Sequence, residues 1–484
     1  MNRTGAALSG FLVVCSLASA VSLIGAAPVP SPIVLKPHQH EQAQFGYRPD
    51  YMPNVPSFDA QNRPYIRSRG ADMHDTGCFQ TLERGAWVQR PFAEAVKAAC
   101  FGFESFQYGG GWYFSHAVFD DDGDMYSIAQ VRTQNRKVHS LLLYSTDGGN
   151  SFQVYPLPVT GGVQKLNIEL RNDCQPLPGP PLIAFMHRVK EHPSRWADYF
   201  RLQVLRPVKS AGRLIIPEPT VVTDKCIGGA THSGGASFAT TIGGNTHFVW
   251  IEIADDAQAP GTPTFVGTYD HATGEVTEKV LVGYAPPVND AHNTPGICAD
   301  SEGYLHVVTG AHTFSFQHMK SAAPNDISGG WTQPVKLLGA EYSIDHGKQT
   351  TEGQQTYLGL VCDSHDTLHV VFRRRQKSSN DAYFPNKDYS ALAYQRKPRN
   401  GAWEAPRVLV VPPIDGYSSY HHKLAIDRRD RLYLSYTYLS EGPRNPYRTM
   451  DGYYHFPAVL MSGDGGESWE LAETKDFAAG IVGG

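Results

Sequence analysis

The sequence lacks the features that mark several common protein classes. It contains no Cys-x-x-Cys pair, which counts against a zinc site built from cysteines. No long segment repeats apolar residues at helical spacing, so we expect almost no helix. The formal net charge of -5 argues against a nucleic-acid-binding protein. The apolar run near the N-terminus is short for a membrane span.

Residues 1–27 have the pattern of a secretory signal peptide. Arg3 supplies the positive end, and an apolar run rich in small residues follows it. Ala18-Ser19-Ala20 and Gly25-Ala26-Ala27 are the candidate cleavage sites, and an uncleaved anchor is the alternative. We therefore expect a secreted, extracellular protein without a membrane span.

Six cysteines follow this segment, and an oxidising compartment would allow them to form disulfides. Cys78 and Cys100 are close in the sequence and are the first pair that we expect. Six cysteines allow 15 connectivities, so the other pairings stay open. The remaining four are Cys174, Cys226, Cys298 and Cys362.

The composition favours short strands joined by turns. The chain has 47 Gly, 34 Pro, 25 Tyr and 22 Phe among its 484 residues. Residues 28–75 are rich in proline and aperiodic, so we expect a linker followed by an irregular first strand. The remaining residues, 76–480, are expected to form the catalytic domain.

One pattern recurs along the chain. An Asp is followed by a short loop, then by Leu or Met, and then by Tyr or His. The pattern starts at Asp120, Asp300, Asp363 and Asp427, with a degraded copy at Thr241. A period of about 60 residues with alternating strands is typical of a β-propeller.

We therefore predict an all-β fold, a seven-bladed β-propeller. Six blades would lie between about residues 100 and 450, and the two ends of the chain would combine into the seventh. Two separate β-sandwiches are the alternative, but the period crosses any boundary between them. Segments 145–152 and 462–469 also resemble the Asp-box turn of sialidase-type propellers, a structural turn that does not mark chemistry.

Four polar residues stand out between residues 290 and 375. His292 and His312 flank one copy of the repeat, and Tyr357 and Arg373 flank the next. Their offsets from Asp300 and Asp363 place each pair on successive strands of one blade. Because the two blades are adjacent, the four side chains can face one pocket.

These side-chain types suit proton abstraction next to a carboxylate. An Arg can hold and neutralise a carboxylate through two parallel hydrogen bonds. A His or Tyr can remove the proton from the adjacent carbon, and a second acid can protonate the departing oxygen. We therefore hypothesise β-elimination from a uronic acid. Arg373 would stabilise the charge, His292 and Tyr357 would act as base and acid in an order left open, and His312 would support them.

The order His, His, Tyr, Arg with spacings of 20, 45 and 16 residues resembles the catalytic set of the β-propeller polysaccharide lyases. These include ulvan lyases and lyases that cleave rhamnose–glucuronate linkages. The resemblance implies a seven-bladed propeller that acts on an acidic polysaccharide, with a His/Tyr pair for acid–base work and an Arg for the carboxylate. No cofactor is required for this chemistry. Some relatives hold a structural calcium or zinc ion, whose ligands cannot be matched in this sequence.

Further residues are candidates for substrate binding, although a lone His in a strand is more often packed or solvated. By alternation Arg375 shares a face with Arg373, and His421, beside His422, opens the last blade. We expect a monomer with no nucleic-acid partner. The substrate-binding candidates are His116, His232, Asn293, Arg375 and His421.

Two other functions remain open. A propeller glycoside hydrolase would need paired carboxylates, or the Arg triad and Tyr/Glu pair of sialidases. The absence of an Arg-Ile-Pro motif near the start counts against a sialidase. A non-catalytic propeller could bind an acidic sugar without cleaving it. The lyase hypothesis requires His292, Tyr357 and Arg373 to lie within reach of one sugar.

Overall fold

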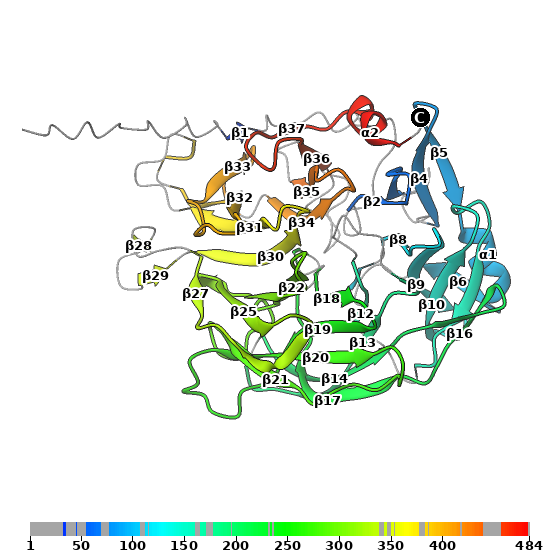
Figure 1. Ribbon diagram of the computed structural model, residues 1–484, viewed down its shortest axis with the longest axis horizontal. Helices are drawn as coiled ribbons and strands as arrows, with labels where there is room; N and C mark the ends of the chain where they lie inside the picture. The colour runs from blue at the N-terminus through cyan, green and yellow to red at the C-terminus, as the bar shows by residue number, and fades with distance from the viewer. Residues whose placement is uncertain are drawn as a thin grey trace, which may run out of the picture.

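The predicted all-β class is confirmed in the computed structural model (Figure 1). Its helices, in the parts of the chain that the structure describes, are the short α1 (Ala93–Ala99) and α2 (Thr474–Gly480). No helix among these residues is both long and apolar enough to span a membrane. The described residues are 32–34, 45, 55–68, 77–106, 112–114, 116–159, 165–170, 178–194, 196–230, 233–234, 237–337, 343–345, 350–352, 354–376, 383–385, 387–416, 419–438 and 456–482.

The described strands form seven sheets of four to six strands and two separate hairpins. The first sheet contains β2 (Ser57–Phe58), β3 (Pro64–Ser68), β4 (Cys78–Glu83) and β5 (Ala86–Pro91). The second contains β6 (Phe103–Phe106), β8 (Val118–Phe119), β9 (Met125–Thr133), β10 (Val138–Ser145) and β11 (Gln153–Pro156). The third contains β7 (Trp112–Phe114), β12 (Lys165–Ile168), β13 (Ile183–Glu191), β14 (Asp198–Leu205) and β17 (Thr220–Ile227).

The other sheets continue in chain order. The fourth contains β18 (Ala239–Ile242), β19 (Asn245–Ile251), β20 (Thr262–Asp270) and β21 (Val280–Ala285). The fifth contains β22 (Gly296–Ala299), β23 (Leu305–Thr309), β25 (Gln317–Ala323), β26 (Asp326–Trp331) and β27 (Val335–Lys336). The sixth contains β24 (His312–Phe314), β30 (Gln355–Cys362), β31 (Leu368–Gln376), β32 (Tyr389–Lys397), β33 (Arg407–Val411) and β1 (Ile33–Val34). The seventh contains β34 (Ser419–Ile426), β35 (Leu432–Tyr438), β36 (Phe456–Ser462) and β37 (Glu470–Leu471). The hairpins are β15 (Val208–Ser210) with β16 (Arg213–Ile215), and β28 (Ser343–Asp345) with β29 (Thr350–Glu352).

The sheets follow one another around a ring, from blue through cyan, green and yellow to orange and red (Figure 1). The first and last sheets pack together and close it. Phe58 and Ile66 share a buried cluster with Tyr433 and Phe477. Burying both sheet faces in this way leaves little apolar surface at the junction.

The expectation that the two ends of the chain combine into one sheet is wrong. Strands β2 to β5 form a sheet of their own, and β34 to β37 form another. Strands β2 and β3 lie within the segment predicted as a linker and first strand, and β3 pairs with β4 across the predicted boundary. The chain therefore enters the sheet structure before residue 76.

The repeated Asp closes the turn between neighbouring strands of a sheet. In the fifth sheet, Asp300 Oδ1 accepts hydrogen bonds from the backbone N–H groups of Glu302 and Tyr304 at 3.2 and 2.8 Å. Its Oδ2 lies 3.1 Å from Nε2 of His306, the Tyr/His position of the repeat. The repeat is therefore a structural unit. The same arrangement surrounds Asp120, Asp363 and Asp427.

The two Asp-box segments form the predicted turns. They connect β10 to β11 and β36 to β37. In each turn the Ser hydroxyl donates to the Asp carboxylate at 2.8 Å and accepts the Gly N–H at 2.8 Å. These local bonds satisfy backbone groups in the turn, as the sequence pattern predicts.

The predicted disulfide between Cys78 and Cys100 is not formed. Cys78 begins β4, whereas Cys100 follows α1 and carries an unpaired thiol. Cys78 lies opposite Pro91 in the ladder between β4 and β5, whereas Cys100 lies beyond the end of α1.

Asn62 connects the first sheet to the C-terminal end of the ring. It is fully buried, and its Nδ2 donates to Asp427 Oδ2 and to the carbonyl oxygen of Gly480, both at 3.0 Å. Its Oδ1 accepts the N–H of Arg428 at 2.9 Å. One amide thus links the turn of the first sheet to the seventh sheet and to the end of α2.

We expect Asn62→Gly to lower the free energy of unfolding by about 2 to 5 kcal/mol, because buried partners lose their hydrogen bonds. Glycine tolerates the φ of 61° at this position, so backbone strain does not confound the result. Urea denaturation gives the measurement. Asn400→Gly, in an exposed turn, is the matched control. Equal losses in both variants would contradict this account of closure.

Candidate functional site

A carboxylate shared by two imidazoles forms the centre of the site. Asp290 Oδ1 lies 2.5 Å from His292 Nδ1, and Asp290 Oδ2 lies 2.8 Å from His312 Nδ1. The backbone N–H of His292 donates to the same Oδ1 at 2.8 Å. The two imidazole rings stack at 4.0 Å between centroids with 27° between their planes.

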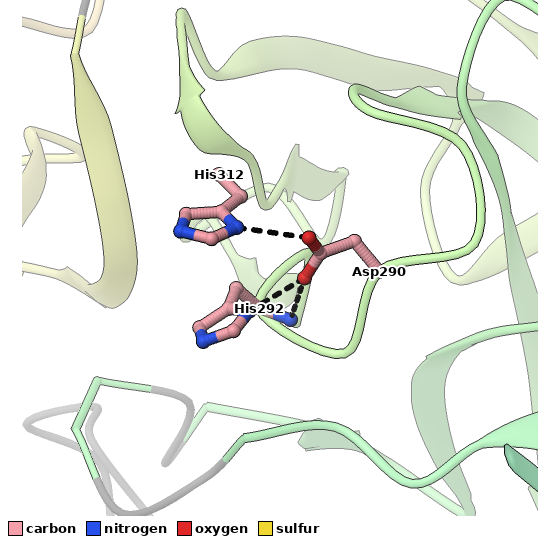
Figure 2. A group of neighbouring side chains, drawn as sticks. All are labelled: Asp290, His292 and His312. Carbon is pink, nitrogen blue, oxygen red and sulfur yellow. Dashed lines mark hydrogen bonds and ion pairs between the residues drawn. The ribbon is translucent and has the colours of Figure 1, made fainter. Parts of the chain in front are cut away.

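This arrangement fixes which nitrogen of each ring is available. Because an ionised carboxylate only accepts hydrogen bonds, each Nδ1 must carry its proton. Each neutral ring therefore presents an unprotonated Nε2, and Figure 2 shows both Nε2 atoms pointing away from Asp290 on the same side. The side chains of His292 and His312 are 12% and 27% exposed, so they are the accessible part of the cluster.

The two histidines come from different structural elements. His292 lies in the turn that precedes β22, and Asp290 begins this turn. His312 begins β24, which leaves the fifth sheet and pairs with β30 of the sixth, opposite Thr356. The prediction that both histidines lie on successive strands of one blade is therefore wrong. The exchange of β24 places His312 next to Tyr357.

Tyr357 and Arg373 lie on paired strands of the sixth sheet. Arg373 pairs with Thr356, and the ladder between β30 and β31 is irregular from Thr356 to Gly359. Tyr357 lies in this bulge with a φ of 61°, in the left-handed region that a tyrosine rarely adopts. Such strain is frequent at functional sites, because a bulge redirects a side chain.

The four predicted residues lie together. The ring of Tyr357 lies 5.5 Å from that of His292 between centroids. The guanidinium carbon of Arg373 lies 4.5 Å from the centroid of the Tyr357 ring. Tyr357 and Arg373 are 2% and 5% exposed, so they form the deeper part of the cluster.

The local electrostatics keep His292 neutral and Asp290 ionised. Burial lowers the pKa of His292, the hydrogen bond to Asp290 opposes this, and the nearby His312 and Arg373 lower it further. Burial alone would raise the pKa of Asp290, but the hydrogen bonds and charges of both histidines hold it well below its usual range. At neutral pH the site therefore offers a neutral imidazole held by a carboxylate.

Other predicted binding residues have structural surroundings. Asn293 is fully buried, and its amide donates to Thr262 Oγ1 at 2.9 Å and to the carbonyl oxygens of Ala285 and Pro287. His116 is buried beside the carbonyl oxygen of Glu169 at 3.4 Å. The hydrogen bonds of these two side chains go mainly to buried backbone carbonyl groups.

Arg375, His421 and His232 differ in their positions. Arg375 is exposed and pairs with Asp388 at 2.8 Å, so it does not share the buried surroundings of Arg373. His421 is buried, and its Nδ1 lies 3.0 Å from Thr437 Oγ1. His232 lies outside the described residues.

Two neighbours of the site, Asp290 and Trp196, were not predicted, and His422, which opens the last blade beside His421, also lies next to the site. Asp290 is the most important, and its signal in the sequence is a carboxylate two residues before His292. His422 donates from Nε2 to the carbonyl oxygen of Tyr357 at 2.7 Å and so holds the strained bulge. The ring of Trp196 lies 5.2 Å from that of His292, and this side chain is 45% exposed.

Asp290, His292 and His312 are also the residues that could hold a metal ion. One ligand atom from each lies within 4.8 Å of the others. Two imidazoles and a carboxylate suit a divalent ion such as zinc. Because both Nδ1 atoms face Asp290, an ion shared by the three residues would replace the two Nδ1–H hydrogen bonds to the carboxylate.

A comparison with protein-family models gives a match over the C-terminal part of the chain. A family model described as a BNR repeat-containing family member matches residues 259–481, which is less than half of the chain and includes the site. No match was found among curated proteins.

Solved structures resemble the fold at low sequence identity. The polysaccharide lyase Uly1 is 12% identical with a TM-score of 0.33, and the match covers 54% of this chain and 58% of that one. A Trypanosoma rangeli sialidase in complex with sialic acid is 13% identical with a TM-score of 0.39, covering 84% and 59%. The BP39L lectin from Burkholderia pseudomallei is 9% identical with a TM-score of 0.49, covering 87% and 98%. Because these scores are low, the function must be argued from the residues of the site.

Burial of neutral His422 predicts acid sensitivity of the fold. Burial lowers its pKa from 6.5 to about 3. Between these values the unfolded chain binds the extra proton, so stability is fully present above the unfolded pKa and falls as pH decreases. This residue contributes a slope of about 1.4 kcal/mol per pH unit.

We expect His422→Gln, whose amide can still donate to Tyr357, to reduce this slope by up to that amount. Urea denaturation at several pH values between the unfolded and folded pKa values gives the measurement. His365→Gln is the control, because the side chain of His365 is 81% exposed. Unchanged slopes in both variants would show that His422 is not a buried neutral group.

Proposed function

We propose that this protein is a secreted polysaccharide lyase, which cleaves a uronate-containing polysaccharide by β-elimination on a seven-bladed propeller. The observation that carries the proposal is the convergence of His292, Tyr357 and Arg373 beside the Asp290 carboxylate. The fold provides seven sheets of four or more strands in the described residues, which fits the proposed blade number. The substrate class is an ulvan-like or rhamnose–glucuronate polysaccharide.

In the first step of the proposed reaction, His292 acts as the base. His292 Nε2 is unprotonated because Nδ1–H is held by Asp290, and the lowered pKa keeps the ring neutral. It removes the proton from the carbon next to the uronate carboxylate. Arg373 pairs with that carboxylate and stabilises the charge that develops on it.

The second step expels the sugar on the neighbouring carbon. The electron pair of the broken C–H bond forms a carbon–carbon double bond, and the glycosidic oxygen leaves. The hydroxyl of Tyr357, whose ring lies near both His292 and Arg373, donates its proton to this oxygen. His312 orients the substrate and shares the charge of Asp290.

Trp196 suits the binding of a neighbouring sugar. It is exposed and lies edge-on to His292 at 5.2 Å between centroids. An indole ring offers a flat apolar face on which a sugar ring can stack. The proposed polysaccharide would thus extend from the catalytic cluster over Trp196.

The cluster does not suit a glycoside hydrolase. Most glycoside hydrolases use two carboxyl groups on opposite sides of the scissile bond, and sialidases use a Tyr/Glu pair with an Arg triad. Among the described residues of the cluster, Asp290 is the single carboxylate, and both of its oxygens accept hydrogen bonds from imidazoles. We also propose that the enzyme is a monomer that needs no cofactor, so a chelator should leave its activity intact.

Ultraviolet absorbance tests the reaction, because elimination creates a double bond conjugated to the carboxylate. With ulvan, gum arabic and other uronate polysaccharides, we expect the absorbance to rise for the natural protein. Tyr357→Phe should reduce the rate by about 10²- to 10⁴-fold through loss of the proton donor. Tyr383→Phe, at an exposed position, should retain the rate. New reducing ends without a rise in absorbance would identify a hydrolase, and binding without either signal would identify a binding module.

Asp290→Asn tests the proposed base. The substitution replaces one carboxylate oxygen by an NH2 group, which cannot accept a hydrogen bond, so one ring loses the acceptor that fixes its tautomer. Since Asp290 raises the pKa of His292, its neutralisation should move the acid limb of kcat/KM to lower pH while reducing the maximum rate. Asp388→Asn should alter neither property. An unmoved acid limb with full activity would rule out His292 as the base.

A further inference from the structure

Two cysteines lie at the boundary between the sheets that carry the site. Cys298 is in β22 of the fifth sheet, and Cys362 ends β30 of the sixth. They belong to the same buried hydrophobic cluster, and their exposed fractions are 8% and 3%. Both carry separate thiols in the structure.

The two strands approach each other closely at Gly296. A Cβ atom at this position would lie only 3.2 Å from Leu360 Cβ, so no larger residue fits without displacement. Residues two positions further along a strand lie on the same side of it. Cys298 lies two positions after Gly296 in β22, and Cys362 lies two positions after Leu360 in β30. The two cysteines therefore lie on the same sides of their strands as Gly296 and Leu360.

The interaction between the two thiols agrees with this alignment of β22 and β30. A hydrogen bond with Cys298, together with burial, raises the pKa of the Cys362 thiol. Several residues of β22 and β30 have Cα atoms within 8 Å of one another. A disulfide requires Cα atoms about 4.4 to 6.8 Å apart, which adjacent inner strands can provide with little movement.

We propose that Cys298 and Cys362 form a redox pair that closes to a disulfide between the fifth and sixth sheets. Each thiol loses a proton, and a sulfur–sulfur bond forms between them. The two electrons pass to a small disulfide such as oxidised glutathione, whose own sulfur–sulfur bond is cleaved to two thiols.

This bond would join the two halves of the site. Cys298 follows His292 on the way into the fifth sheet, and Cys362 lies on the same strand as Tyr357. The link would therefore fix the spacing of these two side chains and stabilise the fold by restricting the unfolded chain. The inference rests on the two strands alone and does not require the proposed lyase activity.

The test is a map of cysteine oxidation in the full chain. The protein is equilibrated in mixtures of reduced and oxidised glutathione, quenched in acid, unfolded, alkylated and digested for mass spectrometry. We expect Cys298 and Cys362 to lose alkylation together and a linked peptide pair to appear. Cys226, which is fully buried, should stay alkylated. The same experiment after refolding from urea ensures that burial does not block the oxidant.

Variants make the result specific. Cys298→Ser should leave Cys362 fully alkylated and remove the rise in Tm that oxidation gives the natural protein. Cys226→Ser should form the link and show the rise. Alkylation of both Cys298 and Cys362 after oxidative refolding, or a link from either of them to a third cysteine, would overturn the proposal.

Discussion

The site depends on one shared carboxylate. Asp290 accepts a hydrogen bond from His292 with one oxygen and from His312 with the other. This pairing sets the tautomer of both rings, stacks them, and directs both free nitrogens to the same side (Figure 2). A neutral imidazole in a partly buried setting is a stronger candidate for a base than the same residue free in solution, because its orientation is already fixed.

The propeller-like ring provides the rigid frame for this pairing. His292 precedes the first strand of the fifth sheet, whereas Tyr357 and Arg373 belong to the sixth. Strand β24 crosses between the two sheets and carries His312 with it. The bulge at Tyr357 is held from behind by His422, so the strained backbone is supported by a buried hydrogen bond. The site is therefore a product of two neighbouring sheets and cannot form in either alone.

The sequence predicts the local features of the fold well. The repeated Asp and its Tyr or His partner act within one turn, so their residue types and spacing are sufficient to predict them. Sheet membership is different, because long-range pairing decides it. The transfer of β24 to the sixth sheet and the separate sheets at the two ends of the chain leave no mark in a local pattern.

The same distinction applies to the site. The spacing within the repeat predicts that the side chains of four residues lie close together, and the structure places them together. These residues are His292, His312, Tyr357 and Arg373. Asn293 and His116 are equally polar in the sequence, but they serve buried backbone groups. Asp290 was missed because its role depends on His312, which lies on a strand that changes sheets.

The most direct test is to digest a uronate polysaccharide in water labelled with heavy oxygen and to measure the masses of the products by mass spectrometry. β-Elimination predicts unsaturated products without the label, whereas incorporation of the label at the new chain ends would show hydrolysis and contradict the account.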